Sequence, residues 1–199
     1  MRKKHLNYFS EKEHHVHTWA CFRDGALALP CRILAHLGIS ADAVSYFGLA
    51  LIFGFLYYAK SAPKIASVFL VIHVIVDAFD GPLARCTKKA SEGGAFTDIV
   101  CDTTGMIISS IGLVYWGLVN ATIGASYAAV YTLLIIFTIS RNQLGAIPKI
   151  TFRPKYIVYA VYIFFAFSAQ NWLSEAMLVF TVAMLPFVIR DYFAIKRKL

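Results

Sequence analysis

The sequence predicts an all-α integral membrane protein, a bundle of six transmembrane helices preceded by an N-terminal amphipathic helix at the membrane interface. Of its 199 residues, 59% are hydrophobic and 15% are charged, whereas soluble domains have roughly 45–50% and about 25%. The hydrophobic residues are grouped into runs close to the ~20 residues that a helix needs to cross a bilayer. There is no repeat or Gly/Ser-rich linker, so we expect a single membrane domain over residues 1–199.

Six apolar runs follow one another along the chain, and four of the five breaks between them contain proline or asparagine. The runs cover residues 43–59, 65–86, 95–118, 121–140, 155–170 and 173–193. Five are long enough to cross a bilayer. The run at 155–170 is the shortest, and its Tyr and Phe residues are typical of a span with aromatic side chains near one interface. We therefore expect residues 41–199 to form the six-helix bundle.

The first 40 residues are predicted to be a cytoplasmic and interfacial segment. They lack the apolar core and small-residue cleavage site of a signal peptide, so we expect them to stay on the mature protein. From Trp19 to Leu37, apolar residues are mixed with charged ones such as Arg23 and Arg32. This mixture favours a helix lying in the interface over a seventh span.

The basic residues predict the orientation. With both termini in the cytoplasm, 17 Lys and Arg lie on the cytoplasmic side and 2 lie outside, as the positive-inside rule requires. The net charge of +8 therefore indicates attraction to anionic lipid and not to nucleic acid. We expect a multi-pass membrane protein with both termini in the cytoplasm.

Acidic residues are crowded in one part of the chain. Of eleven Asp and Glu residues, five lie within 26 residues, namely Asp77, Asp80, Glu92, Asp98 and Asp102. Asp77 and Asp80 share one helix face through i, i+3 spacing, and Asp98 and Asp102 share another through i, i+4 spacing. Two antiparallel helices can therefore direct these four aspartates at one point.

Such a cluster predicts a divalent metal site. Carboxylate oxygens without His or Cys ligands favour Mg²⁺ or Mn²⁺ over zinc. Four carboxylates at one point also repel one another unless a cation lies between them. The predicted metal ligands are Asp77, Asp80, Asp98 and Asp102.

Small residues accompany the aspartates. Gly81 and Ala84 lie next to the aspartate face of the second run, and Gly94 lies one turn before Asp98. They leave room for a bulky ligand against the backbone, or else they serve close helix packing. Arg85 can pair with the carboxylates or hold a phosphate.

Together these residues form a recognisable motif. It reads Asp77-x-x-Asp80-Gly81-x-x-Ala84-Arg85, eight further residues, then Gly94-x-x-x-Asp98-x-x-x-Asp102. The motif resembles, without departure, the signature of the CDP-alcohol phosphotransferase family, also called the CDP-alcohol phosphatidyltransferases. The predicted six spans and N-terminal amphipathic helix extend the resemblance to nearly the whole chain.

The resemblance implies transfer of a phosphoalcohol group from a CDP-linked donor to a hydroxyl acceptor at the cytoplasmic face, with release of CMP. It implies that Asp77, Asp80 and Asp98 bind the divalent metals of a two-metal site. Asp102 would complete that site and act as general base, and the protein would be a homodimer. The CDP pocket would be formed by Gly81, Ala84, Arg85 and Gly94.

Two nearby features of the sequence each allow more than one role. The Thr87 hydroxyl can bind a phosphate or nucleotide oxygen of the donor, or be solvated in the loop. Many relatives begin the first span with a Pro-Asn segment, whereas this chain has Asp42 where the Asn would be. This departure leaves the role of that helix in nucleotide binding open, and Ser40 or Asp42 can also serve as an N-cap.

The acceptor is only weakly specified. Four basic residues are predicted near the cytoplasmic face, namely Arg141, Lys149, Arg153 and Arg190. Converging, they could bind a phosphorylated acceptor; taken separately, they are positive-inside residues. We favour CDP-diacylglycerol as donor and a small polar alcohol as acceptor, with a CDP-choline or CDP-ethanolamine transferase acting on diacylglycerol as the alternative.

A different class of protein also places carboxylates among membrane helices. A divalent-cation channel or transporter does so to line a path for ions. It would not need Gly81, Ala84, Arg85 and Gly94 at their spacings, and its acids would continue through both leaflets. In the outer half of the predicted bundle, Glu175 is the one candidate.

Overall fold

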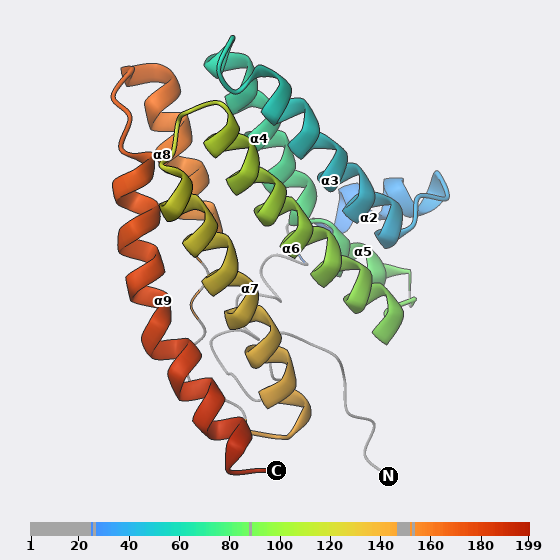
Figure 1. The fold of residues 1–199 in the computed structure, drawn as a ribbon. Helices are drawn as coiled ribbons and strands as arrows, with labels where there is room; N and C mark the ends of the chain where they lie inside the picture. Colours follow the sequence, from blue (N-terminus) through green and yellow to red (C-terminus); the bar gives the residue numbers. More distant parts are fainter. Residues whose placement is uncertain (1–24, 26, 88, 147–151, 153) are drawn as a thin grey trace.

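The protein is a bundle of long helices in a computed structural model (Figure 1). The structure describes residue 25 and residues 27–87, 89–146, 152 and 154–199. Every regular element in that part of the chain is a helix, which confirms the all-α prediction. The helices are α2 (Ala28–His36), α3 (Ala41–Tyr58), α4 (Pro63–Asp77), α5 (Asp80–Cys86), α6 (Glu92–Tyr115), α7 (Ala121–Gln143), α8 (Lys155–Ser168) and α9 (Leu173–Lys196).

Five stretches are long and apolar enough to cross a membrane: α3, α4 continued by α5, α6, α7 and α9. The remaining predicted span, the fifth along the chain, is α8, which has 14 residues. At ~1.5 Å per residue it is about 21 Å long, against the ~30 Å hydrocarbon core of a bilayer. The structure thus agrees with six spans of which the fifth is the shortest.

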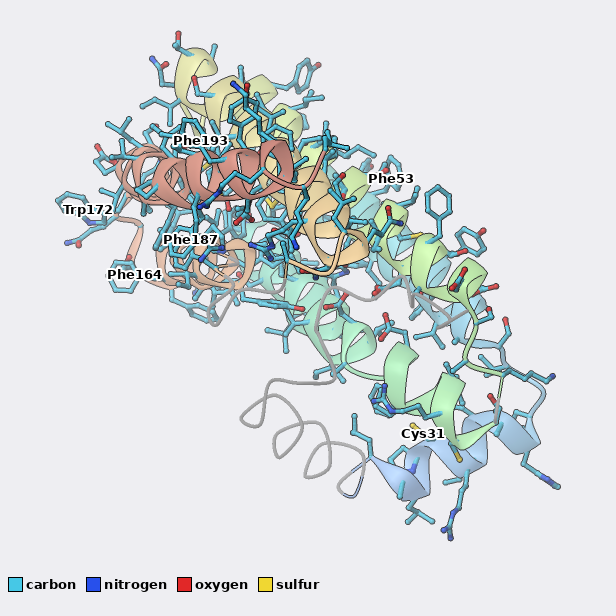
Figure 2. All side chains as sticks on the ribbon, turned by 90° about the horizontal axis from the view of Figure 1, so that it is seen from below. Cys31, Phe53, Phe164, Trp172, Phe187 and Phe193 are labelled. Atoms are coloured by element: carbon cyan, nitrogen blue, oxygen red, sulfur yellow. The ribbon has the colours of Figure 1, made fainter. Side chains whose placement is uncertain are left out.

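The outward faces of these helices are suited to lipid. In each of these five spans, only 17–39% of the most apolar 18-residue stretch is buried within the protein. Large apolar side chains cover the remainder, and Figure 2 shows Phe53, Phe164 and Trp172 at the periphery of the bundle. Because water would penalise so much exposed apolar surface, the helices belong in a membrane.

Capping residues explain where several helices begin. The Ser40 hydroxyl accepts a hydrogen bond of 3.1 Å from the Ala43 amide at the start of α3, which identifies Ser40 as the N-cap. The Ser91 hydroxyl accepts one of 3.0 Å from the Gly94 amide at the start of α6. These bonds satisfy backbone donors that a helix leaves free in its first turn.

The second predicted span is not one uninterrupted helix. The sequence predicts a continuous run over residues 65–86, whereas the structure ends α4 at Asp77 and begins α5 at Asp80. Pro82 explains the break, since it has no amide proton to donate to the carbonyl of Ala78 four residues earlier. The interruption lies between two of the predicted metal ligands.

Close packing positions α3 against both α4 and α6. A Cβ at Gly112 would lie 2.4 Å from Cδ2 of Leu56, and a Cβ at Gly54 would lie 2.5 Å from the Phe69 ring. A larger residue at either position would force the Leu56 or Phe69 side chain to move, and such small residues are common where membrane helices pack closely. The α3–α4, α6–α7 and α8–α9 turns lie at the top in Figure 1, while α5 and the start of α6 lie lower in the bundle.

Helix α2 is the described part of the predicted N-terminal amphipathic helix. It packs on α5, where Cys31, Val44 and Leu83 form a small buried cluster apart from the main core. Its position in the membrane interface stays a prediction.

Candidate active site

The four predicted aspartates come together between α4, α5 and α6. Asp77 is the last residue of α4, Asp80 is the first of α5, and Asp98 and Asp102 lie one turn apart in α6. The carboxyl of Asp77 contacts that of Asp102, and the carboxyl of Asp80 contacts that of Asp98. This pairing is the one expected of two helices running in opposite directions.

Three of these side chains can act as ligands to one cation. One oxygen each of Asp77, Asp98 and Asp102 lies within 4.8 Å of the others. Asp80 is outside this triad and adjoins it through Asp98. Carboxylates that are this close and mostly buried fit a divalent ion that prefers oxygen ligands, such as Mg²⁺ or Mn²⁺.

A lysine that sequence reasoning did not select is part of the same site. Nζ of Lys155, the first residue of α8, lies 2.7 Å from Oδ1 of Asp102 and 3.4 Å from Oδ2 of Asp77. Only 1% of the Lys155 side chain is exposed. The next residue, Tyr156, donates its hydroxyl to Oδ2 of Asp77.

The sequence held one signal for this lysine. Lys155 directly follows a proline and opens an apolar run, and charge counting treats it as a positive-inside residue. A lysine at the start of a span is usually placed by the membrane interface. Here the side chain is buried, because Asp77 of α4 and Asp102 of α6 accept hydrogen bonds from its ammonium group.

A narrow pocket adjoins the aspartates between α3, α4 and α6. Gly48, His73, Asp77, Asp98 and Asp102 are among its lining residues. Nδ1 of the buried His73 lies 2.9 Å from the Gly48 carbonyl oxygen, so that the imidazole links α4 to α3. The pocket therefore reaches from the carboxylates into the bundle.

The residues predicted to hold CDP lie beside the cluster. Gly81 and Ala84 are half-buried on α5, and Arg85 is exposed near its end. Thr87 donates its hydroxyl to the Leu83 carbonyl at 2.8 Å, so this proton is used within its own helix end. This bond leaves the hydroxyl oxygen as an acceptor only.

Gly94 lies next to the residue that departs from the family pattern. A Cβ at Gly94 would be 3.4 Å from Oδ1 of Asp42 and 3.4 Å from the Ser91 hydroxyl. Asp42 is exposed in the first turn of α3. The departure at Asp42 therefore places an additional negative charge beside one of the predicted CDP-binding residues.

Two of the basic residues predicted for the acceptor meet at a buried carboxylate. The Arg141 guanidinium on α7 donates to Oδ1 of Asp191 on α9, and Nε of Arg190 lies 2.8 Å from the same oxygen. Arg141 and Asp191 are buried, whereas 39% of the Arg190 side chain is exposed. Lys149 and Arg153, the other two predicted residues, lie outside the described residues.

Comparison with known proteins gives a family. The model of the family described as CDP-alcohol phosphatidyltransferase matches residues 39–187. A curated relative, archaetidylinositol phosphate synthase of Pyrococcus horikoshii, is 32% identical over 108 residues. That alignment covers 51% of this chain and 57% of the relative's length.

Solved structures show the same fold. The chain resembles a Mycobacterium tuberculosis phosphatidylinositol phosphate synthase in a structure with CDP-DAG bound, with a TM-score of 0.69, 18% identity and coverage of 83% of this chain and 90% of that one. A structure of that synthase with manganese and citrate gives a TM-score of 0.70 at 19% identity, over 83% of this chain and 86% of that one.

Proposed function

Since the chain belongs to the CDP-alcohol phosphatidyltransferase family, we propose that it transfers a phosphatidyl group from CDP-diacylglycerol to a small polar alcohol and releases CMP. The observation that carries this proposal is the convergence of Asp77, Asp80, Asp98 and Asp102 from α4, α5 and α6. These are the carboxylates of the family motif, and the fold brings them to one place.

The chemistry needs charge neutralisation and a base. Mg²⁺ or Mn²⁺ at Asp77, Asp80, Asp98 and Asp102 would neutralise the diphosphate of the donor. Asp102 takes the proton of the acceptor hydroxyl as the hydroxyl oxygen forms its bond to phosphorus. The bond between that phosphorus and the oxygen of CMP breaks, and CMP leaves with the bonding electrons.

The donor pocket lies on the α5 side of the carboxylates. Gly81, Ala84 and Gly94 give the nucleotide close access to the backbone, and Arg85 binds a phosphate oxygen. Thr87 contributes its hydroxyl oxygen as an acceptor, toward an amino or hydroxyl group of the nucleotide. The manganese and CDP-DAG named for the similar synthase structures support this assignment.

We propose further that the acceptor carries a phosphate. Arg190 is partly exposed and is held by Asp191, so its guanidinium can meet an anion while its orientation is fixed. Arg141 is buried against the same carboxylate, so its positive charge adds to that of Arg190. Relatives named as synthases of inositol phosphate lipids support a phosphorylated polyol as the acceptor class.

The location follows from the charge distribution. We propose one domain over residues 1–199, with both termini and the active site at the cytoplasmic face, because 17 of the 19 basic residues then lie inside. The homodimer implied by the resemblance is part of the same proposal. Cross-linking in native membranes tests it.

The experiment is a donor and acceptor screen with purified protein. CDP-diacylglycerol and CDP-choline are each offered with inositol phosphate, glycerol phosphate, serine and diacylglycerol, and CMP release is measured with Mg²⁺, with Mn²⁺ and with EDTA. We expect CMP only with CDP-diacylglycerol, a phosphorylated acceptor and metal.

Other outcomes point to the alternatives. Turnover with CDP-choline and diacylglycerol would identify the second type of transferase. Turnover with serine would support CDP-diacylglycerol as the donor but would contradict the proposal that Arg190 binds a phosphate of the acceptor. Metal flux into vesicles without CMP release would favour a channel, which the family match already opposes.

A further inference from the structure

We propose that the ammonium of Lys155 and a divalent metal ion bind the same carboxylates in turn, so that metal binding displaces Lys155 from the site. The inference rests on the proposed function, because it assumes that the aspartate cluster holds a divalent ion. It assigns to Lys155 a role that the family motif does not contain.

The contacts show that the lysine uses metal-ligand oxygens. Lys155 Nζ lies 2.7 Å from Oδ1 of Asp102 and 3.5 and 3.4 Å from the two oxygens of Asp77. Asp77 and Asp102 are two of the three residues whose oxygens lie within 4.8 Å of one another. The ammonium is thus bound to the candidate metal ligands themselves.

Two cations do not share these oxygens favourably. A divalent ion coordinated by Asp77 and Asp102 would lie within a few ångströms of Nζ, and the two positive charges would repel one another with little water between them. The metal has the larger charge and also gains Asp98 as a ligand. The lysine is therefore the cation that leaves.

Among the described residues, the carboxylates that hold the Lys155 ammonium are those of Asp77 and Asp102. Lys155 is the first residue of α8, and the positive end of a helix dipole disfavours a cation there. The Tyr156 ring, 4.9 Å from Nζ, adds a weak cation–π attraction. A buried ammonium without a carboxylate partner is costly, so loss of Asp77 and Asp102 to a metal forces the side chain toward water or a bound phosphate.

Amine labelling tests the displacement in the unaltered protein. The purified full-length chain is treated with an amine-reactive ester in EDTA and, separately, in saturating Mn²⁺, and the labelled lysines are counted by mass spectrometry. We expect Lys155 to be protected in EDTA and labelled at least about fivefold more in Mn²⁺. Lys196, exposed in the last turn of α9, is the internal control and should react equally in both.

Metal affinity tests the competition independently. Mn²⁺ binding, followed by electron paramagnetic resonance of the free ion, is compared for wild type, Lys155→Met and the control Lys196→Met. Methionine has nearly the length of lysine without its charge. Because the metal no longer displaces a charge-assisted contact, we expect about 10-fold tighter binding or more in Lys155→Met, with Lys196→Met unchanged.

The results separate this inference from the proposed function. Lys155 that stays protected in saturating Mn²⁺ overturns the inference alone, as does unchanged or weaker Mn²⁺ binding by a folded Lys155→Met variant. A wild-type protein that binds no Mn²⁺ overturns the inference together with the metal-dependent function. If Lys155→Met does not fold, wild-type labelling decides the question.

Discussion

Nε of Arg190 lies 2.8 Å from Oδ1 of Asp191, its neighbour on α9, and that carboxylate also accepts from Arg141 and, at 3.3 Å, from the Thr138 hydroxyl. Asp191 has no exposed side-chain surface. A buried carboxylate with donors from α7 and α9 fixes both guanidiniums. Arg190 is thereby held against Asp191 with its side chain partly exposed.

Asp191→Asn should therefore weaken acceptor binding more than catalysis. We expect KM for a phosphorylated acceptor to rise about 10-fold or more, with kcat nearly unchanged. The free energy of unfolding should fall by about 3–5 kcal/mol, because Arg141 loses the partner of a buried pair. Steady-state kinetics and chemical denaturation measure the two effects.

A matched control lies on the same helix. Glu175→Gln changes an exposed carboxylate in the first turn of α9 and should alter neither quantity. An equal rise in KM for a neutral acceptor would contradict the assignment of Arg190 to a phosphate.

Each aspartate of the cluster should be essential for turnover. Asp77→Asn, Asp80→Asn, Asp98→Asn and Asp102→Asn should each reduce CMP release at least about 100-fold. Since Asp80 lies outside the triad, Asp80→Asn should retain more Mn²⁺ affinity than Asp98→Asn. EDTA should abolish turnover and added Mg²⁺ or Mn²⁺ restore it; full activity in EDTA would refute a metal-dependent reaction.

Gly94→Ala separates donor binding from folding. The new Cβ would lie 3.4 Å from its nearest neighbours, Asp42 and Ser91, so the helix can accommodate it and the melting temperature should not fall. A methyl group against the donor should nevertheless raise the donor's KM about 10-fold. Gly93→Ala is the control, because its Cβ would have one neighbour, the Ser91 hydroxyl at 3.8 Å. Equal KM values for the two variants would argue against a CDP pocket at Gly94.

Asp42→Asn should improve donor binding. The Asp42 carboxylate lies beside Gly94, where it repels a diphosphate in the proposed pocket. Removing one exposed charge is worth up to about 1 kcal/mol, so the KM for CDP-diacylglycerol should fall about two- to fivefold. Asp42→Glu should leave it near the wild-type value, and an increase in KM for Asp42→Asn would mean that the carboxylate is itself a ligand contact.

The orientation can be tested by labelling cysteines in intact cells. In a variant with Cys86 replaced by serine, a cysteine at Ala121 should react with an impermeant maleimide and one at Ala90 should not. Both positions are exposed, so accessibility within the protein does not decide the result. Labelling at Ala90 alone would reverse the proposed topology.

The helices and the motif could be predicted from sequence because they depend on local order. Apolar runs and their breaks specify the spans, and the i, i+3 and i, i+4 spacings put Asp77 with Asp80 and Asp98 with Asp102. The family match over residues 39–187 confirms the family prediction made from this motif. The apolar pattern predicted the span over residues 65–86, but it did not reveal that the span is divided into α4 and α5 just before Pro82.

The partners of the charged side chains were decided by the tertiary structure. Lys155 and Asp102 are 53 residues apart, and Arg141 and Asp191 are 50 apart. Helical periodicity tells which face a residue occupies on its own helix, but not which helix packs against that face or at what height. Those two variables depend on close approaches such as Gly112 on Leu56, and they determine which basic residue reaches the aspartates and which is held by Asp191.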